Sequence, residues 1–428
     1  MTTPSSAVRG LRVALYLVLT GVVAALHIWK LPPALPMLQS ELGLDLVQSG
    51  FLVSTVQVGG MMLGLLAGLL AERIGLKRCI LIGLAIMASG SAAGAQLATV
   101  GPIMALRAIE GCGFLMVVMP IPSLIRRQVP INVLSRVMGL WSCYIPIGSI
   151  LILVFGSWML SVASWRALWM LLAVLTVAAL VLVWRTVPTD RRRAMPSSTA
   201  ASTSSSTPRL DTGSAHPATG APVVRPSAIS LIRETLGALP VWLVAFTFSM
   251  YSAQWMAVIG FLPTIYASGG ITGTTAGLLT GLVAGCNIIG NLIAGQLLHK
   301  EVPARQLLIV GFSAMIVCAY LAFGTGLPFA GQFLSVALLS ASGGLIPATM
   351  FNMALMVAPS PRTTTTTVGW MQQGSSFGQF SGPPIVAWVV SMAGGWEYAW
   401  MATTAFSVGG IVLALVLERS TAEQTKNG

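Results

Sequence analysis

Long apolar segments recur along this chain, and nearly all of its basic residues lie in alternate connections between them. The sequence has 428 residues and 23 Lys and Arg. All of these cations except Lys30, Arg107 and Arg166 fall in segments that one alternating topology places on the same side of a membrane. Each apolar segment approaches the ~20 residues that a helix needs to cross a bilayer. The pattern therefore predicts a membrane protein with several helical spans and a basic cytoplasmic face.

Twelve such segments predict an all-α membrane protein with twelve transmembrane helices and both termini in the cytoplasm. Hydrophobic residues make up 55% of the chain and charged residues only 8%, a balance that is rare in soluble domains. We expect a multi-pass protein of the cell inner membrane whose first span is retained, because no small-residue cleavage site follows it. The spans are expected to begin near Leu11, Leu46, Cys79, Pro102, Leu134, Ala167, Leu239, Thr275, Leu307, Phe329, Val368 and Ala399.

The formal net charge of +12 does not indicate nucleic-acid binding, because the cations are scattered through short loops at the ends of apolar segments. The five cysteines lie in or at the start of predicted spans and form no C-x-x-C pair. The sequence also has no metal-ligand cluster, no phosphate-binding loop and no nucleophile beside a base. We therefore expect no metal, no cofactor, no nucleic-acid partner and no enzymatic activity.

A polar tract divides the chain. Residues 188–232 are rich in Ser, Thr, Ala and Pro, and they are too polar to pack, so we expect a disordered cytoplasmic linker. The linker separates an N-terminal six-helix half, residues 1–187, from a C-terminal six-helix half, residues 233–420. A short cytoplasmic tail, residues 421–428, follows the second half.

The two halves contain similar sequence segments at corresponding positions. The string WRALWM at residues 165–170 returns as WEYAWM at residues 396–401, and an Ala-Gly pair at 67–68 returns at 294–295. Two parallel halves of this kind are typical of transporters that rock around a central site between the halves.

The connection after the second span carries an ordered motif. Residues 68–78 read GLLAERIGLKR, which resembles the signature loop of the major facilitator superfamily. The glycines permit close helix approach and a tight turn, and the charges can form a cluster that latches one conformation. The alternative is a generic basic loop. The predicted conformational latch consists of Gly68, Glu72, Arg73, Gly75 and Lys77.

A second motif, RAIEGCG at residues 107–113, resembles the fourth-helix motif of the same superfamily. Glu110 is the acidic residue that lies deepest within a predicted span, and Arg107 precedes it by three residues on the same helix face. An ionisable group at this depth costs several kcal/mol unless it is paired or hydrated, so it indicates a functional site. We expect Glu110 and Arg107 to couple transport to protons. The alternative is a static ion pair that braces the bundle.

Further segments suggest a branch of the superfamily. Residues 119–127, 137–142, 260–266 and 371–372 are similar to the cyanate permease and nitroimidazole transporter family. This resemblance implies a small, anionic or polar substrate. The first span departs from that family, because AALHIWK at residues 24–30 stands where an arginine is usual. The glycine-rich fifth-helix signature of drug and proton antiporters is mostly absent, which disfavours drug export.

Lys30 and His27 lie near the end of the first span. A lysine in the outer third of the span, followed by several prolines, is expected to face a central cavity and attract an anion. The alternative is a lysine that snorkels to the outer interface. His27 lies one turn earlier and can relay protons near neutral pH, or it can be a hydrogen-bonded packing residue.

Polar and aromatic residues on three other spans are plausible cavity lining, because those spans correspond to one another in the half-repeat. Such side chains are also common at bilayer interfaces and between helices. Besides Lys30, the predicted substrate-binding residues are Trp141, Tyr144, Tyr251, Gln254, Trp255, Gln372 and Gln373.

These patterns together predict a monomeric secondary transporter that moves a small anionic or polar solute by alternating access, with protons as the coupling ion in symport. Its other partner is membrane lipid. The first alternative is an exporter of drugs or metabolites by proton antiport. A channel or a membrane-embedded sensor is a more distant alternative.

Overall fold

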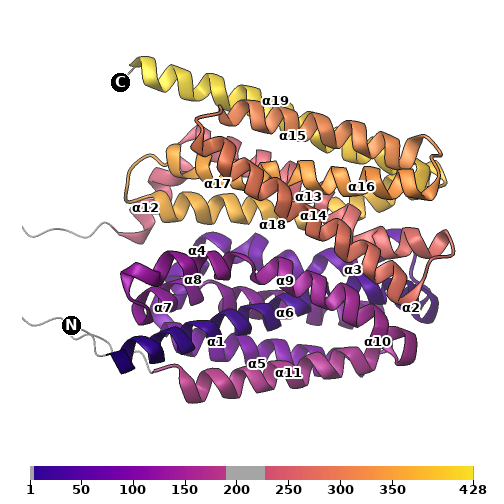
Figure 1. Cartoon of the computed structure of the whole chain (residues 1–428), viewed down its shortest axis with the longest axis horizontal. Coiled ribbons are helices and arrows are strands. Elements are labelled where there is room, and N and C mark those ends of the chain that lie inside the picture. The colour runs from indigo at the N-terminus through magenta and orange to yellow at the C-terminus, as the bar shows by residue number, and fades with distance from the viewer. Residues whose placement is uncertain (1–3, 189–226, 428) are drawn as a thin grey trace, which may run out of the picture.

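The computed structural model describes residues 4–188 and 227–427. These residues are almost entirely helical, and no strand occurs among them. Figure 1 shows two layers of long, roughly parallel helices, with the N-terminal half below and the C-terminal half above. The first turns of α1 (Pro4–Trp29) and the last turns of α19 (Ala399–Asn427) lie at the same end of the molecule, here called the terminus end. Because both ends of the described chain lie on one side, the chain crosses the bundle an even number of times.

The described N-terminal half continues from α1 through ten further helices, interrupted by two short helical turns. They are α2 (Leu31–Leu42), α3 (Leu46–Ser54), η1 (Thr55–Gln57), α4 (Val58–Ile74), α5 (Leu76–Gly94), α6 (Val100–Val118), α7 (Ile121–Gln128), α8 (Ile131–Ser142), α9 (Tyr144–Leu151), η2 (Ile152–Gly156), α10 (Ser157–Val162) and α11 (Trp165–Thr186).

The C-terminal half is built in the same way and ends in α19. Its other elements are α12 (Ala228–Leu236), α13 (Leu239–Ser268), α14 (Gly273–His299), α15 (Ala304–Ala319), η3 (Tyr320–Gly324), α16 (Phe329–Gly343), α17 (Leu345–Met356), α18 (Thr364–Ala393) and η4 (Trp396–Tyr398).

Eleven segments of the described chain are long and apolar enough to cross a membrane, which confirms the predicted helical membrane fold. The remaining expected span, which begins near Val368, corresponds to α18, which has 30 residues and packs against α13 on one side and against α3 and α4 on another. Its run of threonines and its glutamines lower its mean hydropathy. A helix that is covered on several sides by other helices needs less apolar surface than one that faces lipid.

Local sequence explains where several of these helices begin. Asp45 caps α3 by accepting a hydrogen bond from the Gln48 backbone N–H, and the Gln48 side chain accepts one from the Asp45 backbone N–H. Ser164 caps α11 in the same position. Gly75 joins α4 to α5 with a φ of +98°, a backbone conformation that residues other than glycine rarely adopt. This glycine therefore makes the tight turn that the motif predicts.

The chain between the halves becomes helical earlier than expected. The predicted linker extends to residue 232, but Ser227 caps a helix, α12, that begins at Ala228. Residues 228–232 are therefore helical, because a cap and apolar side chains at the helical spacing of Ile229 and Ile232 favour a helix there. Residues 189–226 lie outside the described chain. The predicted tail begins at 421, whereas α19 continues to Asn427.

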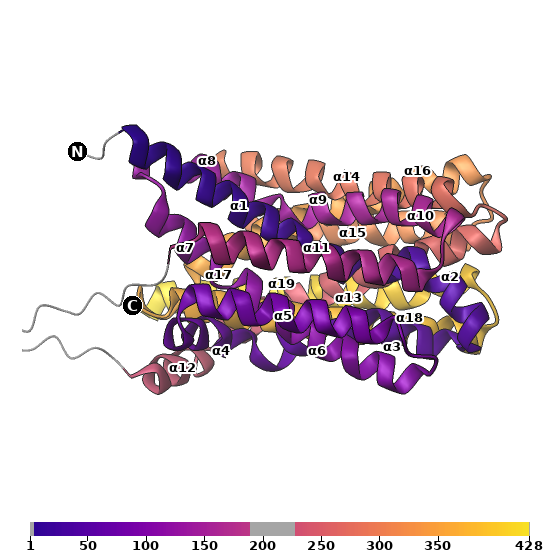
Figure 2. The same ribbon diagram turned by 90° about the horizontal axis from the view of Figure 1, so that it is seen from below.

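The two halves meet along a seam of small residues. α2 packs on α13, α3 and α4 pack on α18, and α9, η2 and α10 pack on α14. A side chain at Gly50 would collide with Pro384, and one at Gly277 would collide with the Leu153 carbonyl. Because lipid supplies no hydrophobic force between helices, such close approach is how membrane helices gain contact. Helices α2 and α10 lie at the end opposite the termini, so the halves are packed together there (Figures 1 and 2).

Gly277→Leu is expected to open this opposite end. A Cβ at position 277 would collide with the Leu153 carbonyl oxygen and with the Ser157 Oγ, both in the other half. Overpacking of this kind costs about 1–3 kcal/mol, which is enough to shift an equilibrium between two conformers. Double electron–electron resonance between spin labels at Ser40 on α2 and Ser268 on α13 measures the result as a longer distance, after the five native cysteines are replaced.

The matched control is Gly101→Leu, because a side chain at Gly101 meets no atom within 4 Å. Its distance distribution is expected to equal that of the unsubstituted protein. An unchanged distribution in Gly277→Leu as well would contradict a role of this contact in closing the opposite end.

Candidate functional site

The N-terminal half encloses a cluster of ionisable side chains, here called the charged cluster: His27, Lys30, Arg107 and Glu110. His27 comes from the last turn of α1, Lys30 from the junction of α1 and α2, and the other two from α6. Each of the four side chains is at most 1% exposed. Charged groups are almost never this buried unless they are paired, so the cluster is the feature that most needs a functional account.

Glu110 is the centre of the charged cluster. Its Oε1 accepts a hydrogen bond from the Lys30 Nζ at 2.7 Å, and its Oε2 accepts one from an Arg107 terminal nitrogen at 2.6 Å. His27 Nδ1 lies 3.6 Å from Glu110 Oε1. Arg107 and Glu110 are one helical turn apart, so this contact is local. Lys30 reaches Glu110 only because α1 and α6 pack against each other.

Arg107 also completes the end of α1. It donates to the His27 carbonyl at 2.7 Å and to the Ile28 carbonyl at 3.4 Å. The Ile28 carbonyl lacks its usual helical donor, because the residue four positions later is Pro32, which has no N–H. The prolines that follow Lys30 thus end α1 at the point where an arginine from α6 can bind its last carbonyls.

Polar groups of α5 and α11 hold Lys30 from the other side. Its Nζ donates to Ser91 Oγ at 2.9 Å and lies 4.2 Å from the centre of a ring of Trp169. Ser91 in turn donates to the Trp169 carbonyl at 3.0 Å. A carboxylate, a hydroxyl and an aromatic face therefore surround the buried ammonium group and stabilise it.

Hydrogen bonding also assigns the proton of the His27 ring. His27 Nε2 lies 2.7 Å from Thr176 Oγ1, and this hydroxyl donates its one hydrogen to the Leu172 carbonyl at 2.7 Å. Nε2 must therefore donate to Thr176. In a neutral ring the lone pair of Nδ1 then faces the Glu110 carboxylate, and Nδ1 has no hydrogen-bond partner among the described residues. A proton between Nδ1 and Oε1 would join the two groups.

The charged cluster holds two fixed cations and one carboxylate. Lys30 and Arg107 share Glu110, and no other carboxylate of the described residues forms an ion pair with either cation. When the His27 ring is neutral, the charged cluster therefore carries one excess positive charge in the interior of the N-terminal half. This excess favours the approach of an anion.

Lys30 was expected to bind the substrate and Glu110 to couple transport to protons, and the structure brings these two side chains into direct contact. Arg107 and His27 complete the same cluster. The residues missed by sequence reasoning are Ser91, Trp169 and Thr176, because a single small hydroxyl or a tryptophan in an apolar helix has no distinguishing pattern.

The other predicted substrate-binding residues do not form one cluster. Trp141 and Tyr144 stack on each other with ring centres 4.3 Å apart, inside the N-terminal half. Gln254 is fully buried in the C-terminal half, where it hydrogen-bonds Ser407 at 3.0 Å. Tyr251 accepts a hydrogen bond from Asn287 at 2.9 Å.

Two of the predicted residues lie on the seam between the halves. Gln373 binds the Met61 carbonyl at 2.7 Å and the Leu65 N–H at 3.0 Å. Trp255 packs edge-to-face on Trp29, the neighbour of Lys30, with ring centres 5.2 Å apart. Trp29 was not among the residues predicted from the sequence. Gln372 is half-buried beside Gln373 on α18.

The predicted latch lies at the terminus end, and the structure describes only part of it. Gly68, Glu72 and Arg73 belong to α4, but their side-chain environment lies outside the described residues. Lys77 is buried and donates to the Trp184 carbonyl at 2.9 Å and to the Val187 carbonyl at 2.5 Å, at the end of α11. Its Nζ therefore joins the start of the third span to the end of the sixth.

A bundle of two helical halves that meet along a membrane-spanning seam, with ionisable groups buried inside, defines a multi-pass membrane protein of the transporter type. The profile of the Major Facilitator Superfamily matches residues 17–362 and, in a second match, residues 244–428. This chain belongs to the Major Facilitator Superfamily.

Two uncharacterized MFS-type transporters of Mycobacterium tuberculosis are each 29% identical to this chain over 152 residues. The matched segment covers 34% of this chain and 22% of each relative, so the chain spans about a fifth of the length of these relatives.

Solved structures show the same fold at low sequence identity. A bacterial homolog of the human lysosomal transporter Spinster, in an inward-facing and unoccupied conformation, is 15% identical over 99% of both chains with a TM-score of 0.78. A nucleoside transporter is 17% identical over 95% of this chain and 99% of its own, with a TM-score of 0.70. A D-xylose–proton symporter is 16% identical over 96% of this chain and 97% of its own, with a TM-score of 0.69.

Proposed function

We propose that this protein is a proton-coupled symporter that moves a small anionic or polar solute, such as cyanate, nitrate or a small carboxylate, by alternating access. The observation that carries this proposal is the buried contact of Glu110 with both Lys30 and Arg107. We place the protein in the cell inner membrane, as a monomer.

The excess positive charge of the charged cluster supports an anionic solute. Two cations and one carboxylate lie together with almost no access to solvent, so their net positive charge is not screened by water. This charge would attract a second negative group strongly. The resemblance of several segments to the cyanate permease and nitroimidazole transporter family points to the same class of substrate.

The arrangement also accounts for coupling to a proton. If an anion draws Lys30 away from Glu110, the carboxylate loses one of its two cationic partners. A proton that binds between Glu110 and His27 Nδ1 restores the lost positive charge on that side. The solute and the proton then enter together with no change in the buried charge, which is the electrostatic basis of symport.

The seam between the halves supports the alternating-access part of the proposal. Trp29 and Trp255 meet across it, and neither indole N–H has a hydrogen-bond partner among the described residues. Buried donors are rarely left unpaired, so both are available to a polar solute that passes between the halves. The remaining predicted lining residues, Gln254, Gln372 and Gln373 among them, are secondary candidates for solute contact.

An exporter that works by proton antiport is the alternative, because a buried carboxylate and histidine can also exchange protons against a substrate. The two mechanisms predict opposite proton movements. When solute is added outside, symport acidifies the vesicle interior as the solute enters. Antiport makes the interior more alkaline, because protons leave as the solute enters.

The test uses the purified protein in proteoliposomes that contain a trapped pH-sensitive dye. Cyanate, nitrate, small carboxylates and a nitroimidazole are added outside in turn. We expect one of these solutes to acidify the interior in a saturable manner, and liposomes without protein give the background. Alkalinisation would support the antiport alternative instead. Saturable exchange of labelled solute without any proton movement would contradict proton coupling, and unsaturable flux would indicate a channel.

A further inference from the structure

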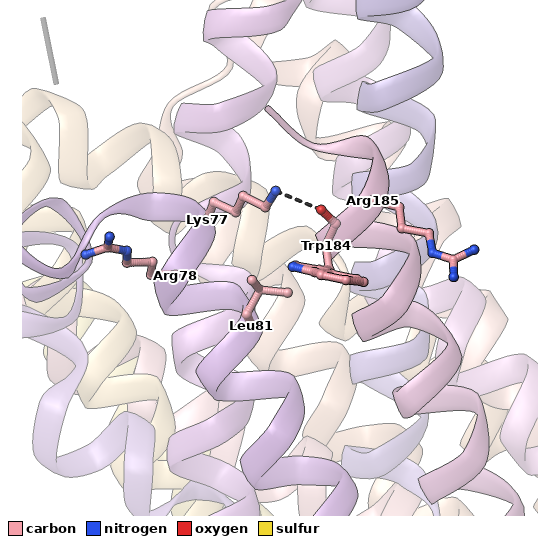
Figure 3. A pocket seen from close by; sticks show the side chains of 5 residues that line it. All are labelled: Lys77, Arg78, Leu81, Trp184 and Arg185. Carbon is pink, nitrogen blue, oxygen red and sulfur yellow. Dashed lines mark hydrogen bonds between the residues drawn. The ribbon is translucent and has the colours of Figure 1, made fainter. Parts of the chain in front are cut away.

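A basic pocket of about 520 Å³ opens at the terminus end, between the first turns of α5 and the last turn of α11. Figure 3 shows Lys77, Arg78 and Leu81 on α5 and Trp184 and Arg185 on α11. None of these side chains belongs to the charged cluster. The pocket thus has a separate location and its own set of cations.

The geometry of this pocket is set by Lys77. Its hydrogen bonds to the Trp184 and Val187 carbonyls fasten the start of α5 to the end of α11, as the dashed line to Trp184 in Figure 3 shows. These carbonyls are the negative end of α11, and a lysine there neutralises them. The pocket between the two helix ends is therefore present before any ligand binds.

Arg78 and Arg185 flank this fastened junction. Both are exposed, and neither forms an ion pair with a carboxylate among the side chains that the structure describes. Arg78 also lies in the first turn of α5, at the positive end of that helix, where a cation is unfavourable and an anion is stabilised. Figure 3 shows the two guanidinium groups turned away from each other, on opposite sides of the pocket. Both belong to long, exposed side chains that can turn inward, and guanidinium groups suit the oxygens of a phosphate.

The surroundings of the pocket favour a phosphate that is attached to acyl chains. Trp184 is 61% exposed and lies at the end of a span, the usual position of a tryptophan at a membrane interface. On α11 an exposed stripe of Val174, Val177 and Val181 leads from Trp184 along the helix, at the three- and four-residue spacing of one helix face. A headgroup in the pocket would therefore have an apolar surface for its chains directly beside it.

We propose that this pocket binds the phosphate of an anionic phospholipid on the cytoplasmic side of the membrane. On binding, the Arg78 and Arg185 side chains turn inward from the positions in Figure 3, and their guanidinium groups bind the phosphate oxygens. Trp184 packs against the glycerol region, and the acyl chains lie along the exposed stripe of α11. A bound lipid of this kind bridges the third span to the sixth and so stabilises the N-terminal half as one body.

Native mass spectrometry of the delipidated protein in detergent tests this proposal. The probes are phosphatidylglycerol, phosphatidylcholine with the same chains, and glycerol 3-phosphate, which offers the phosphate without chains. We expect phosphatidylglycerol to bind, and the variant Arg78→Gln/Arg185→Gln to bind it roughly tenfold or more weakly. The single variant Arg185→Gln, which changes one exposed side chain, is expected to show an intermediate loss.

The matched control is Arg233→Gln/Arg362→Gln, which removes the same charge from exposed positions outside the pocket. It is expected to bind phosphatidylglycerol as the unsubstituted protein does. Equal binding by the control and the pocket variant would overturn the proposal, as would equal binding of phosphatidylcholine. Binding of glycerol 3-phosphate as tight as that of the lipid would overturn the assignment to lipid and leave a site for soluble phosphate esters.

Discussion

Glu110→Gln is expected to abolish solute uptake driven by a pH gradient while leaving exchange of labelled solute across the membrane intact. A glutamine has nearly the same shape, and its one carbonyl oxygen still accepts a hydrogen bond from one of the two cations, Lys30 or Arg107. Its amide nitrogen is a donor, and the side chain does not bind a proton at working pH. Exchange needs the solute site and the movement of the halves, whereas net uptake against a gradient also needs the proton. The substitution therefore separates the two processes.

Glu41→Gln is the matched control. Glu41 lies in the same half and accepts hydrogen bonds from Trp165 at 2.6 Å and Arg166 at 2.9 Å, but it is 38% exposed and is not part of the charged cluster. Both uptake and exchange are expected to survive in this variant. Gradient-driven uptake that persists in Glu110→Gln would contradict the coupling role, and the charged cluster would then be a brace within the N-terminal half.

Glu110→Ala is expected to lower the free energy of unfolding by about 3–5 kcal/mol, the usual effect of removing one partner from a buried ion pair. The alanine leaves both Lys30 and Arg107 buried without a counter-charge. Lys30→Met is expected to cost less, because the remaining Arg107–Glu110 pair is still balanced and methionine fills a similar volume. The asymmetry between the two variants follows from the two-to-one ratio of cations to carboxylate.

Thermal unfolding of the purified variants in detergent measures this asymmetry as a larger fall in Tm for Glu110→Ala than for Lys30→Met. The double variant Lys30→Met/Glu110→Ala is expected to recover part of the loss, because only one cation is then left unpaired. Glu41→Ala serves as the control, since exposed ion pairs contribute at most about 1 kcal/mol. Equal destabilisation by Glu110→Ala and Lys30→Met would contradict a shared carboxylate.

Much of the fold was predictable because the sequence of each short segment by itself indicates whether that segment spans a membrane. Each span shows its apolar length in a short window, and the distribution of lysine and arginine orients all of them. The α18 helix was found in the same way, although its threonines lower its hydropathy. The start of α12 was missed, because a short amphipathic helix after a Ser-rich tract looks like the tract that precedes it.

The charged cluster was predictable only in part. Arg107 and Glu110 are three residues apart, so the period of one helix places them on one face. The contact between Lys30 and Glu110 joins residues that are 80 positions apart, and Lys30 was expected to face a cavity or the interface instead. Thr176, which assigns the proton of His27, is 149 positions away and carries no pattern of its own.

The sequence by itself determined that the chain crosses a membrane many times in two similar halves, and it identified Glu110 as an ionisable group at an unusual depth. These conclusions need only the length, hydropathy and charge of each segment. The tertiary structure decided which groups share that carboxylate. Packing of α1 against α6 brings the four ionisable side chains of the charged cluster together, and α5 and α11 supply their further polar partners Ser91 and Thr176. Buried charges are stable only when they are paired.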